Sequence, residues 1–357
     1  MSVFRGTFPA LRELLILVRC DNQRGCDLGE KVKIPEGIQL LRENIVSKAN
    51  LFGLPVREKV SWTKGLKLND GGQTILFTGC GYEFLGAARS MTSAIRKMEL
   101  VGVERGTRLA RAIGKLGFNL PGIYARLSAG KGGGELLRAA VRVLQTLGVE
   151  FSYLGEEEPC CGGPLYFLGF QKDFVEKARE TFCLLKKRGV RRMIVIVPSC
   201  TYTLKELYPH FVEGFDIEVK SILEVLSERM TPMKLPEPIV AAYHDPCLLS
   251  RYLGLREEPR RILEMVENLE LREPEWTRKE WSTCCGGGGG FEVVLPKLSS
   301  LLAQRRAEEL LELKPQVIVT SCPGCLLQLE EGLRRTRAEG VKVVDLVQIL
   351  EKAQKER

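Results

Sequence analysis

The stretch MIVIVPSC, at residues 193–200, is a run of β-branched and apolar residues that ends at a cysteine. QVIVTSC (316–322) repeats this pattern, and ILFTGC (75–80) and IVAAYHDPC (239–247) are further apolar runs that lead into a cysteine. Short, continuously apolar runs of this kind predict strands that are buried on both faces, as in a parallel sheet.

Helical patterns separate these runs. The segments 167–189 and 295–313 carry apolar residues at helical spacing between polar ones. The alternation of strand and helix predicts an α/β fold with parallel sheets. Ligands in such folds bind at the carboxyl ends of the strands, where the cysteines of all four runs stand.

Two double cysteines indicate that the chain contains an internal repeat. EEEPCCGG (156–163) and EWSTCCGG (280–287) each lie between the two cysteine-ended runs of their half. We therefore predict an N-terminal arm (1–72), a first repeat (73–232) and a second repeat (233–357). Three prolines within 228–238 indicate a linker between the repeats.

Composition narrows the class of protein. Lys and Arg number 53 against 45 Asp and Glu, a net charge of +8 that is spread along the 357 residues without a basic arm, which argues against nucleic acid as a partner. No stretch has the roughly 18 apolar residues of a membrane helix, and no signal peptide is visible, so we expect a cytoplasmic protein without a direct membrane span. Any membrane association would then be through a partner. In this setting, the 12 cysteines indicate metal ligands or catalytic groups.

The second repeat carries a motif of five cysteines: Cys247, Cys284, Cys285, Cys322 and Cys325. Five thiolates exceed the four ligands of a structural zinc ion or of an ordinary iron–sulfur cluster. Two adjacent thiolates can reach two irons of one extended cluster. The glycines at 286–290 let backbone N–H groups approach the sulfurs and leave room for a bulky substrate.

This motif resembles the cysteine-rich CCG domain of heterodisulfide reductase catalytic subunits. Related domains occur in anaerobic glycerol-3-phosphate dehydrogenase and in iron–sulfur subunits of lactate and glycolate oxidation. The resemblance implies an iron–sulfur oxidoreductase in which the five second-repeat cysteines hold a non-cubane [4Fe-4S] cluster.

The first repeat matches this motif incompletely. Cys80, Cys160, Cys161 and Cys200 fill four positions, and Thr203 stands at the fifth. Four thiolates suit zinc, a second iron–sulfur cluster of ordinary type or a modified non-cubane cluster, and both metals stay open here. The longer interval between Cys80 and the double cysteine predicts a helical insertion at about 90–135. Cys183, on the apolar face of a predicted helix, is expected to be a small buried residue.

The N-terminal arm contains CDLGEKVKIPEGIQLLRENIVSKANLFGLP (26–55), which resembles the segment that follows the ferredoxin domain in these reductases. A two-cluster ferredoxin needs runs of four closely spaced cysteines, whereas this region offers Cys20 and Cys26. We therefore expect a helical remnant of a ferredoxin-like segment that carries no cluster of its own.

His244 precedes Cys247 by three residues and is the candidate catalytic residue. Its titration range suits a general acid that protonates a departing thiolate. The alternative is a hydrogen-bond donor that orients the end of the strand. Arg251 neutralises cluster charge, binds an anionic substrate or is an ordinary surface residue.

The leading functional hypothesis is an iron–sulfur oxidoreductase subunit that takes electrons from a partner and reduces a disulfide. The electron-donating subunit would be of ferredoxin type, a flavoprotein or a b-type cytochrome. The alternative is an electron-transfer subunit of a flavin-dependent lactate, glycolate or glycerol-3-phosphate dehydrogenase. A purely structural zinc protein would leave one of the five thiolates without a role.

Overall fold

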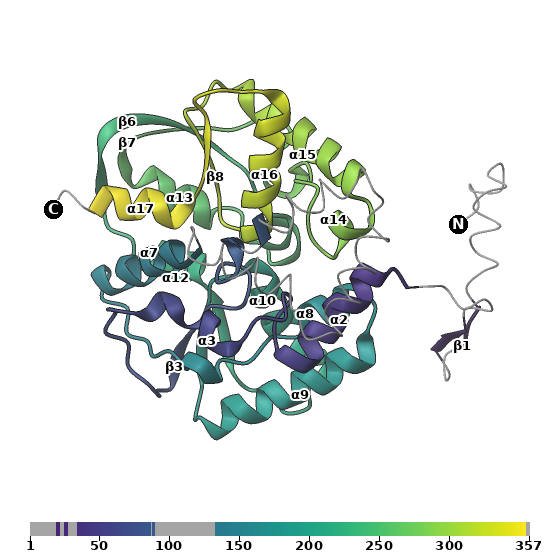
Figure 1. Cartoon of the computed structure of the whole chain (residues 1–357). Helices are drawn as coiled ribbons and strands as arrows, with labels where there is room; N and C mark the ends of the chain where they lie inside the picture. The colour runs from purple at the N-terminus through teal and green to yellow at the C-terminus, as the bar shows by residue number, and fades with distance from the viewer. Residues whose placement is uncertain (1–18, 22–24, 28–33, 87, 90–132, 355–357) are drawn as a thin grey trace, which may run out of the picture. The chain divides into compact units, whose positions relative to one another are not determined.

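The structure is a computed structural model, and it describes residues 19–21, 25–27, 34–86, 88–89 and 133–354 (Figure 1). The chain divides into two compact units, Met1–Pro35 and Glu36–Arg357. The predicted insertion at 90–135 lies almost wholly outside the described residues. None of the described helices is long and apolar enough to cross a membrane.

The first unit contains a two-stranded antiparallel hairpin, β1 (Arg19–Asp21) and β2 (Gly25–Asp27), in which Cys20 stands opposite Cys26. The helix predicted to follow this region is α2 (Glu36–Lys48), which belongs to the second unit. It leads into the short helices α3 (Val56–Lys59) and η1 (Ser61–Thr63). The absence of a cluster from this region stays a prediction.

The first sheet has three parallel strands in the order β3 (Thr74–Phe77), β4 (Arg192–Val195), β5 (Glu218–Ser221). Ser152 forms a parallel bridge to Ile75 on the other edge of β3. The last three residues of β3 and of β4 are all buried, as expected of strands covered on both faces. The helices of this half within the described residues are α7 (Gly133–Thr146), η2 (Gly155–Glu157), α8 (Gly163–Phe167), α9 (Gln171–Lys187), α10 (Pro198–Tyr202), the π-helical turn η3 (Thr203–Leu207), α11 (Tyr208–Phe211) and α12 (Ile222–Arg229).

The second sheet has four parallel strands in the order β7 (Val266–Arg272), β6 (Met233–Tyr243), β8 (Val317–Thr320), β9 (Lys342–Asp345). The order β6-β8-β9 corresponds to β3-β4-β5, and β7 lies where Ser152 bridges in the first half. The helices are the π-helical turn η4 (Leu248–Tyr252), α13 (Glu258–Glu264), η5 (Lys279–Trp281), α14 (Phe291–Val294), α15 (Pro296–Leu311), α16 (Pro323–Thr336) and α17 (Leu346–Gln354). The parallel α/β architecture predicted for both halves is therefore confirmed.

The predicted linker at 228–238 is wrong for most of its length. Met233 begins the 11-residue strand β6, and the residues between Lys234 and Ile239 form an irregularity in its pairing with β7. Two of the three prolines, Pro236 and Pro238, lie in this irregularity. Proline cannot donate to a strand ladder, and bulges are where sheets accommodate it.

The two halves share one apolar core, and they are also in contact through the loops that follow their parallel strands. Figure 1 shows α17, in yellow, beside α7 of the first half, and both helices contribute side chains to the same core cluster. The hydroxyl of Tyr82, two residues after Cys80, donates a hydrogen bond to Asp345 at the end of β9. A Cβ atom on Gly81 would lie 2.7 Å from Cγ of Pro323, so the loops that carry Cys80 and Cys322 are in contact.

Candidate metal centres

The cysteines of the second repeat form what we call the second centre, and those of the first repeat form the first centre. The second centre lies where two adjacent parallel strands end. Cys247 follows β6, and Cys322 follows its neighbour β8 and is the N-cap of α16. Cys325 stands in the first turn of α16, and the pair Cys284–Cys285 comes from the loop between η5 and α14. The topology thus brings the five predicted cysteines to one edge of the second sheet.

Cys285 is at the middle of this group. Its sulfur lies 3.2 Å from that of Cys325. Hydrogen bonds from Cys284 and then from Cys325 lower the pKa of Cys285 well below its ordinary value, although burial opposes this. Cys247 lies farther out, where burial and then the charges of Cys322 and Cys285 raise its pKa to about 11. Thiols that share protons in this way are suited to binding a metal cluster once they are deprotonated.

The second centre is open on one side. Cys285 and Cys325 are buried, Cys247 and Cys322 are half-buried, and Cys284 is exposed. A centre with exposed ligands leaves room for another molecule to approach, as catalytic metal sites do.

The glycines after the double cysteine have two separate roles. The N–H of Gly286 donates to the Cys284 sulfur at 3.3 Å, as predicted for this run. A Cβ at Gly286 would lie 2.4 Å from the Ser299 carbonyl oxygen, so only glycine fits between the loop and α15. Gly288 and Gly289 are exposed and face open space. Room for an approaching molecule is therefore confined to the latter two glycines.

His244 is buried beside these sulfurs. One of its ring nitrogens and the sulfurs of Cys285 and Cys325 lie within 4.8 Å of one another. Nδ1 accepts a hydrogen bond of 3.1 Å from Nε of Arg306, which is itself fully buried on α15. Burial lowers the pKa of His244, while the neighbouring Cys285 acts in the opposite direction. Among the described residues, Nε2 of His244 has no hydrogen-bond partner.

A buried ion pair positions the loop before Cys284. The guanidinium of Arg260 donates to both carboxylate oxygens of Asp245, each at 2.7 Å. Asp245 in turn accepts from the backbone N–H of Lys279, and the Ser282 hydroxyl donates to the Asp245 carbonyl. Arg251 donates to the Glu280 and Ser282 carbonyls. The structure thus places Arg251 in support of this loop.

The first centre is closed. Cys80, Cys160, Cys161 and Cys200 are all buried, with exposed fractions of 9% or less. The sulfurs of Cys161 and Cys200 are 3.3 Å apart, and Cys160 forms hydrogen bonds with both Cys161 and Cys80. These bonds lower the pKa of Cys160 well below its ordinary value. Four buried thiols without an open side are typical of a structural or electron-transfer centre.

Glu158 joins the two loops of the first centre. Its carboxylate accepts from the backbone N–H groups of Thr78 (2.8 Å) and Gly79 (3.0 Å), just before Cys80. Lys59 forms a buried ion pair with it at 3.2 Å. Burial alone would lower the pKa of Lys59, but the charge of Glu158 raises it above its ordinary value. Nearby Glu83 has a pKa raised well above its ordinary value by burial, which favours its protonated form.

Thr203 is buried in the π-helical turn that follows α10. Its hydroxyl donates to the Ser199 carbonyl at 2.7 Å. A Cβ at Gly163 would lie 2.2 Å from this hydroxyl oxygen, so Thr203 packs closely against Gly163, the second residue after the first double cysteine. The side chain at 203 is thus next to the loop that carries Cys160 and Cys161.

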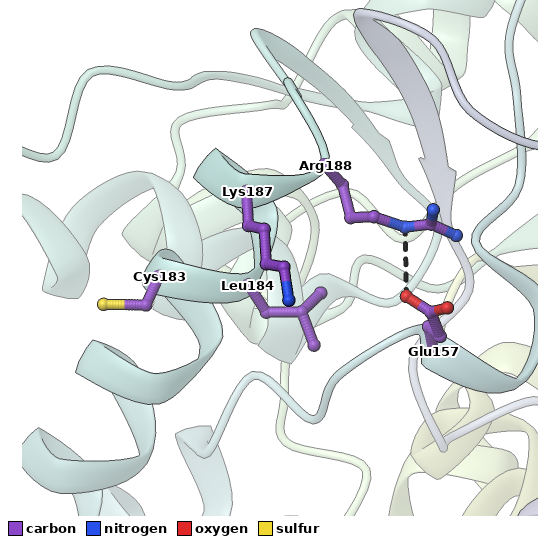
Figure 2. A pocket seen from close by; sticks show the side chains of 5 residues that line it. All are labelled: Glu157, Cys183, Leu184, Lys187 and Arg188. Carbon is purple, nitrogen blue, oxygen red and sulfur yellow. Dashed lines mark ion pairs between the residues drawn. The ribbon is translucent and has the colours of Figure 1, made fainter.

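The prediction that Cys183 is buried is wrong. The buried residues of α9 include Phe174, Ala178 and Phe182, and Cys183 points away from this face and is exposed. Figure 2 shows Cys183 with Lys187 on the same helix, at a cavity of about 400 Å³ that Leu184, Arg188 and Glu157 also line. None of the nine predicted site cysteines lines this cavity.

The donor sets fit the groups predicted for them. In the second centre, five cysteines come from three loops at one edge of the sheet, and a single zinc ion would leave one of their thiols without a metal. In the first centre, four buried thiols match the ligand number of zinc and of an ordinary iron–sulfur cluster.

Known protein families and curated proteins include relatives of this chain. Residues 128–205 and 241–330 match the family described as CCG, cysteine-rich domain. A subunit of the fumarate reductase (CoM/CoB) of Methanothermobacter marburgensis is 32% identical over 219 residues, which are 60% of this chain and 42% of that protein. EtfAB:quinone oxidoreductase of Syntrophomonas wolfei is 33% identical over an aligned stretch that covers 60% of this chain and 31% of that protein.

A third relative is a subunit of the dihydromethanophenazine:CoB–CoM heterodisulfide reductase of Methanosarcina barkeri. It is 30% identical over a stretch that covers 60% of this chain and 54% of that protein. The chain thus spans about a third to a half of the length of these relatives. All three are named oxidoreductases or subunits of them.

Sequence reasoning missed several residues that shape the two centres. They are Glu158 and Lys59 at the first centre, and Arg306, Arg260 and Asp245 at the second. Two of them have a local signal, because Glu158 and Asp245 each stand two residues before a site cysteine. The others come from distant segments, and only the fold shows where they lie.

Proposed function

Since the chain carries two copies of the CCG cysteine-rich domain, we propose that it is an iron–sulfur oxidoreductase subunit that reduces a disulfide at its second centre. Cys247, Cys284, Cys285, Cys322 and Cys325 would hold a non-cubane [4Fe-4S] cluster there. One relative is named a subunit of a heterodisulfide reductase, and this name supports disulfide reduction as the reaction class.

The observation that carries the proposal is the contrast between the two centres. The second gathers five thiols and is open at Cys284, whereas the first gathers four thiols and is closed. Substrate chemistry needs access, and electron storage or structural support does not. We therefore assign the disulfide to the second centre, and zinc or a second iron–sulfur cluster to the first.

Reduction of a disulfide to two thiols takes up two electrons and two protons. The cluster, when bound, would supply electrons singly and offer iron for a substrate sulfur. The chain itself provides the approach at Gly288 and Gly289, and the Gly286 N–H stabilises the Cys284 thiolate. Contact between the loops of Cys80 and Cys322 would give a short electron path if the first centre also holds iron.

Electrons would come from a partner protein, of ferredoxin type, a flavoprotein or a b-type cytochrome. The names of the relatives, which include a quinone oxidoreductase and subunits of larger enzymes, support a chain that works in a complex. The partner's identity and any association with a membrane through it belong to this proposal.

The second candidate function is electron transfer without substrate chemistry, in a flavin-dependent dehydrogenase for lactate, glycolate or glycerol 3-phosphate. The likeness to EtfAB:quinone oxidoreductase favours this candidate. In that case the open side of the second centre would receive a partner protein instead of a small disulfide.

One assay separates the two candidates. The anaerobic protein is supplied with a reduced viologen dye and a panel of small disulfides, and thiol release is measured. The disulfide reductase candidate predicts turnover that Cys284→Ser abolishes and the exposed control Cys183→Ser leaves unchanged. Absence of thiol release, together with fast reduction of the protein by a flavoprotein, would establish the electron-transfer candidate instead.

A further inference from the structure

Arg306 is an unusual residue to find next to a cysteine-rich centre. It comes first by volume among the fully buried side chains of the described residues, and it reaches from α15 to His244 just after β6. Burial of a guanidinium costs several kcal/mol unless its donors are paired. Here Nη1 donates to Glu309 at 2.8 Å and to Thr277 at 3.0 Å, and Nε donates to Nδ1 of His244 at 3.1 Å.

The bond from Arg306 fixes which nitrogen of His244 carries hydrogen. A guanidinium can only donate hydrogen bonds, so Nδ1 must be the acceptor. The hydrogen of the imidazole is then on Nε2, which cannot ligate a metal while it carries that hydrogen. The same bond prevents a second hydrogen at Nδ1, so the ring is not arranged to give up a proton as an imidazolium acid would.

The ring therefore has one hydrogen-bond donor, Nε2–H, and two cysteine sulfurs of the second centre are near the ring. A ring nitrogen of His244 lies within 4.8 Å of the sulfurs of Cys285 and Cys325. The sulfur of Cys285 is buried and lies 3.2 Å from that of Cys325, and no other described residue is paired with Nε2 of His244. An additional N–H directed at a ligand sulfur stabilises the more negative, reduced form of a cluster.

We propose that Arg306 is a positioning residue that holds His244 as an Nε2–H donor to the Cys285 sulfur and thereby raises the reduction potential of the second centre. This inference rests on the iron–sulfur cluster proposed above. It assigns to His244 the hydrogen-bonding role, the second of the two roles that its position in the sequence allows.

The first repeat provides an internal comparison. Phe77 stands three residues before Cys80, as His244 does before Cys247. Phe182 follows Cys161 at the same interval at which Arg306 follows Cys285, and both phenylalanines are buried. The polar pair of the second repeat is thus replaced by two apolar residues in the first. The proposed N–H donor is specific to the open centre.

The test is a double-mutant cycle on the midpoint potential of the cluster, measured by EPR-monitored redox titration of the full chain. His244→Phe introduces the residue that the first repeat already has. We expect His244→Phe to shift the equilibrium between the reduced and oxidised cluster about tenfold toward the oxidised form. For a one-electron couple this shift lowers the midpoint potential by about 59 mV. Arg306→Met should lower the potential similarly, and the double variant should show no further shift. Arg305→Met, which changes the exposed neighbour on α15, is the matched control and should leave the potential unchanged.

Two results would overturn the proposal. One is a potential in His244→Phe equal to that of the wild type. The other is an equal additional shift from Arg306→Met in the His244→Phe background, because a direct charge effect of the arginine would be additive. If Arg306→Met does not fold, Arg306→Lys completes the cycle, since lysine keeps the charge beside Glu309 but lacks the planar Nε–H donor.

A second readout is independent of iron. The chain has two histidines, and the other, His210, is exposed and serves as an internal reference. In the full chain loaded with diamagnetic zinc, nitrogen NMR of 15N-histidine protein should show His244 with hydrogen on Nε2. Hydrogen on Nδ1 would contradict the proposal. If the wild type binds no iron, the proposed function fails, and this readout still decides the role of Arg306.

Discussion

Replacing Glu158 by glutamine should destabilise the protein through the first centre. The Glu158 side chain is 0% exposed and pairs with Lys59 at 3.2 Å. Removal of one partner from a buried ion pair leaves the other charge uncompensated and costs about 3–5 kcal/mol. Lys59 keeps its hydrogen bond to the Glu158 backbone carbonyl at 2.6 Å, and the nearby Glu83 can ionise once the Glu158 charge is gone, so we expect a loss near the lower bound, about 3 kcal/mol.

The assay is anaerobic urea denaturation, with metal content of the folded protein as a second measurement. Glu157→Gln is the matched control, because Glu157 is the preceding residue, is 57% exposed and pairs with Arg188 at the surface. Such a pair contributes about 0–1 kcal/mol. The double variant Lys59→Met/Glu158→Gln should lose less than the sum of the single variants, since no buried charge is then left alone. A loss in Glu158→Gln within about 0.5 kcal/mol of that in Glu157→Gln would refute the reasoning.

Three further predictions follow from individual contacts. Thr203→Cys should give the first centre a fifth thiol and a non-cubane EPR signal that the wild type lacks, whereas a wild type that already shows two equivalent signals would contradict a role for Thr203. Asp345 has a pKa raised by burial to about 6, so the folded state holds its proton longer than the unfolded chain, and stability should fall as pH rises from about 4 to 6. Asp345→Asn should remove that fall and be about 3 kcal/mol more stable than the wild type at pH 7, as measured by urea denaturation across pH. His244→Gln should slow disulfide turnover less than tenfold because His244 donates a hydrogen bond to sulfur, and a loss of about 10²–10⁴-fold, as expected when a general acid is removed, would contradict this role.

The main features of the fold could be predicted from sequence because buried parallel strands leave continuous apolar runs. ILF at the end of β3 and VIVT in β8 are such runs, and each leads into a site cysteine. Strand β7 (VENLELR) was missed because it alternates charged and apolar residues, and the prolines of β6 indicated a linker instead of an irregular strand.

The cysteines of the two centres were also predictable, since the double cysteines align the repeats. The surroundings of these centres were not. Arg306 reads as one charge among many on α15, and Lys59 as part of a polar segment, because burial of a charged side chain depends on tertiary contacts that local patterns do not contain. Cys183 shows the converse case, in which an apolar neighbourhood along the chain does not place a residue in the core.

The most direct test of the central claim is anaerobic iron and sulfide analysis with EPR of the oxidised protein, compared between the wild type and the variants Cys284→Ser and Cys322→Ser. Cys183→Ser is the control for loss of an exposed thiol. We predict about four irons at the second centre of the wild type and an EPR signal that changes when a thiol or disulfide is added. Both should be lost in the two site variants but not in the control. Unchanged iron content and spectrum in Cys284→Ser and Cys322→Ser would contradict the assignment of the cluster to this centre.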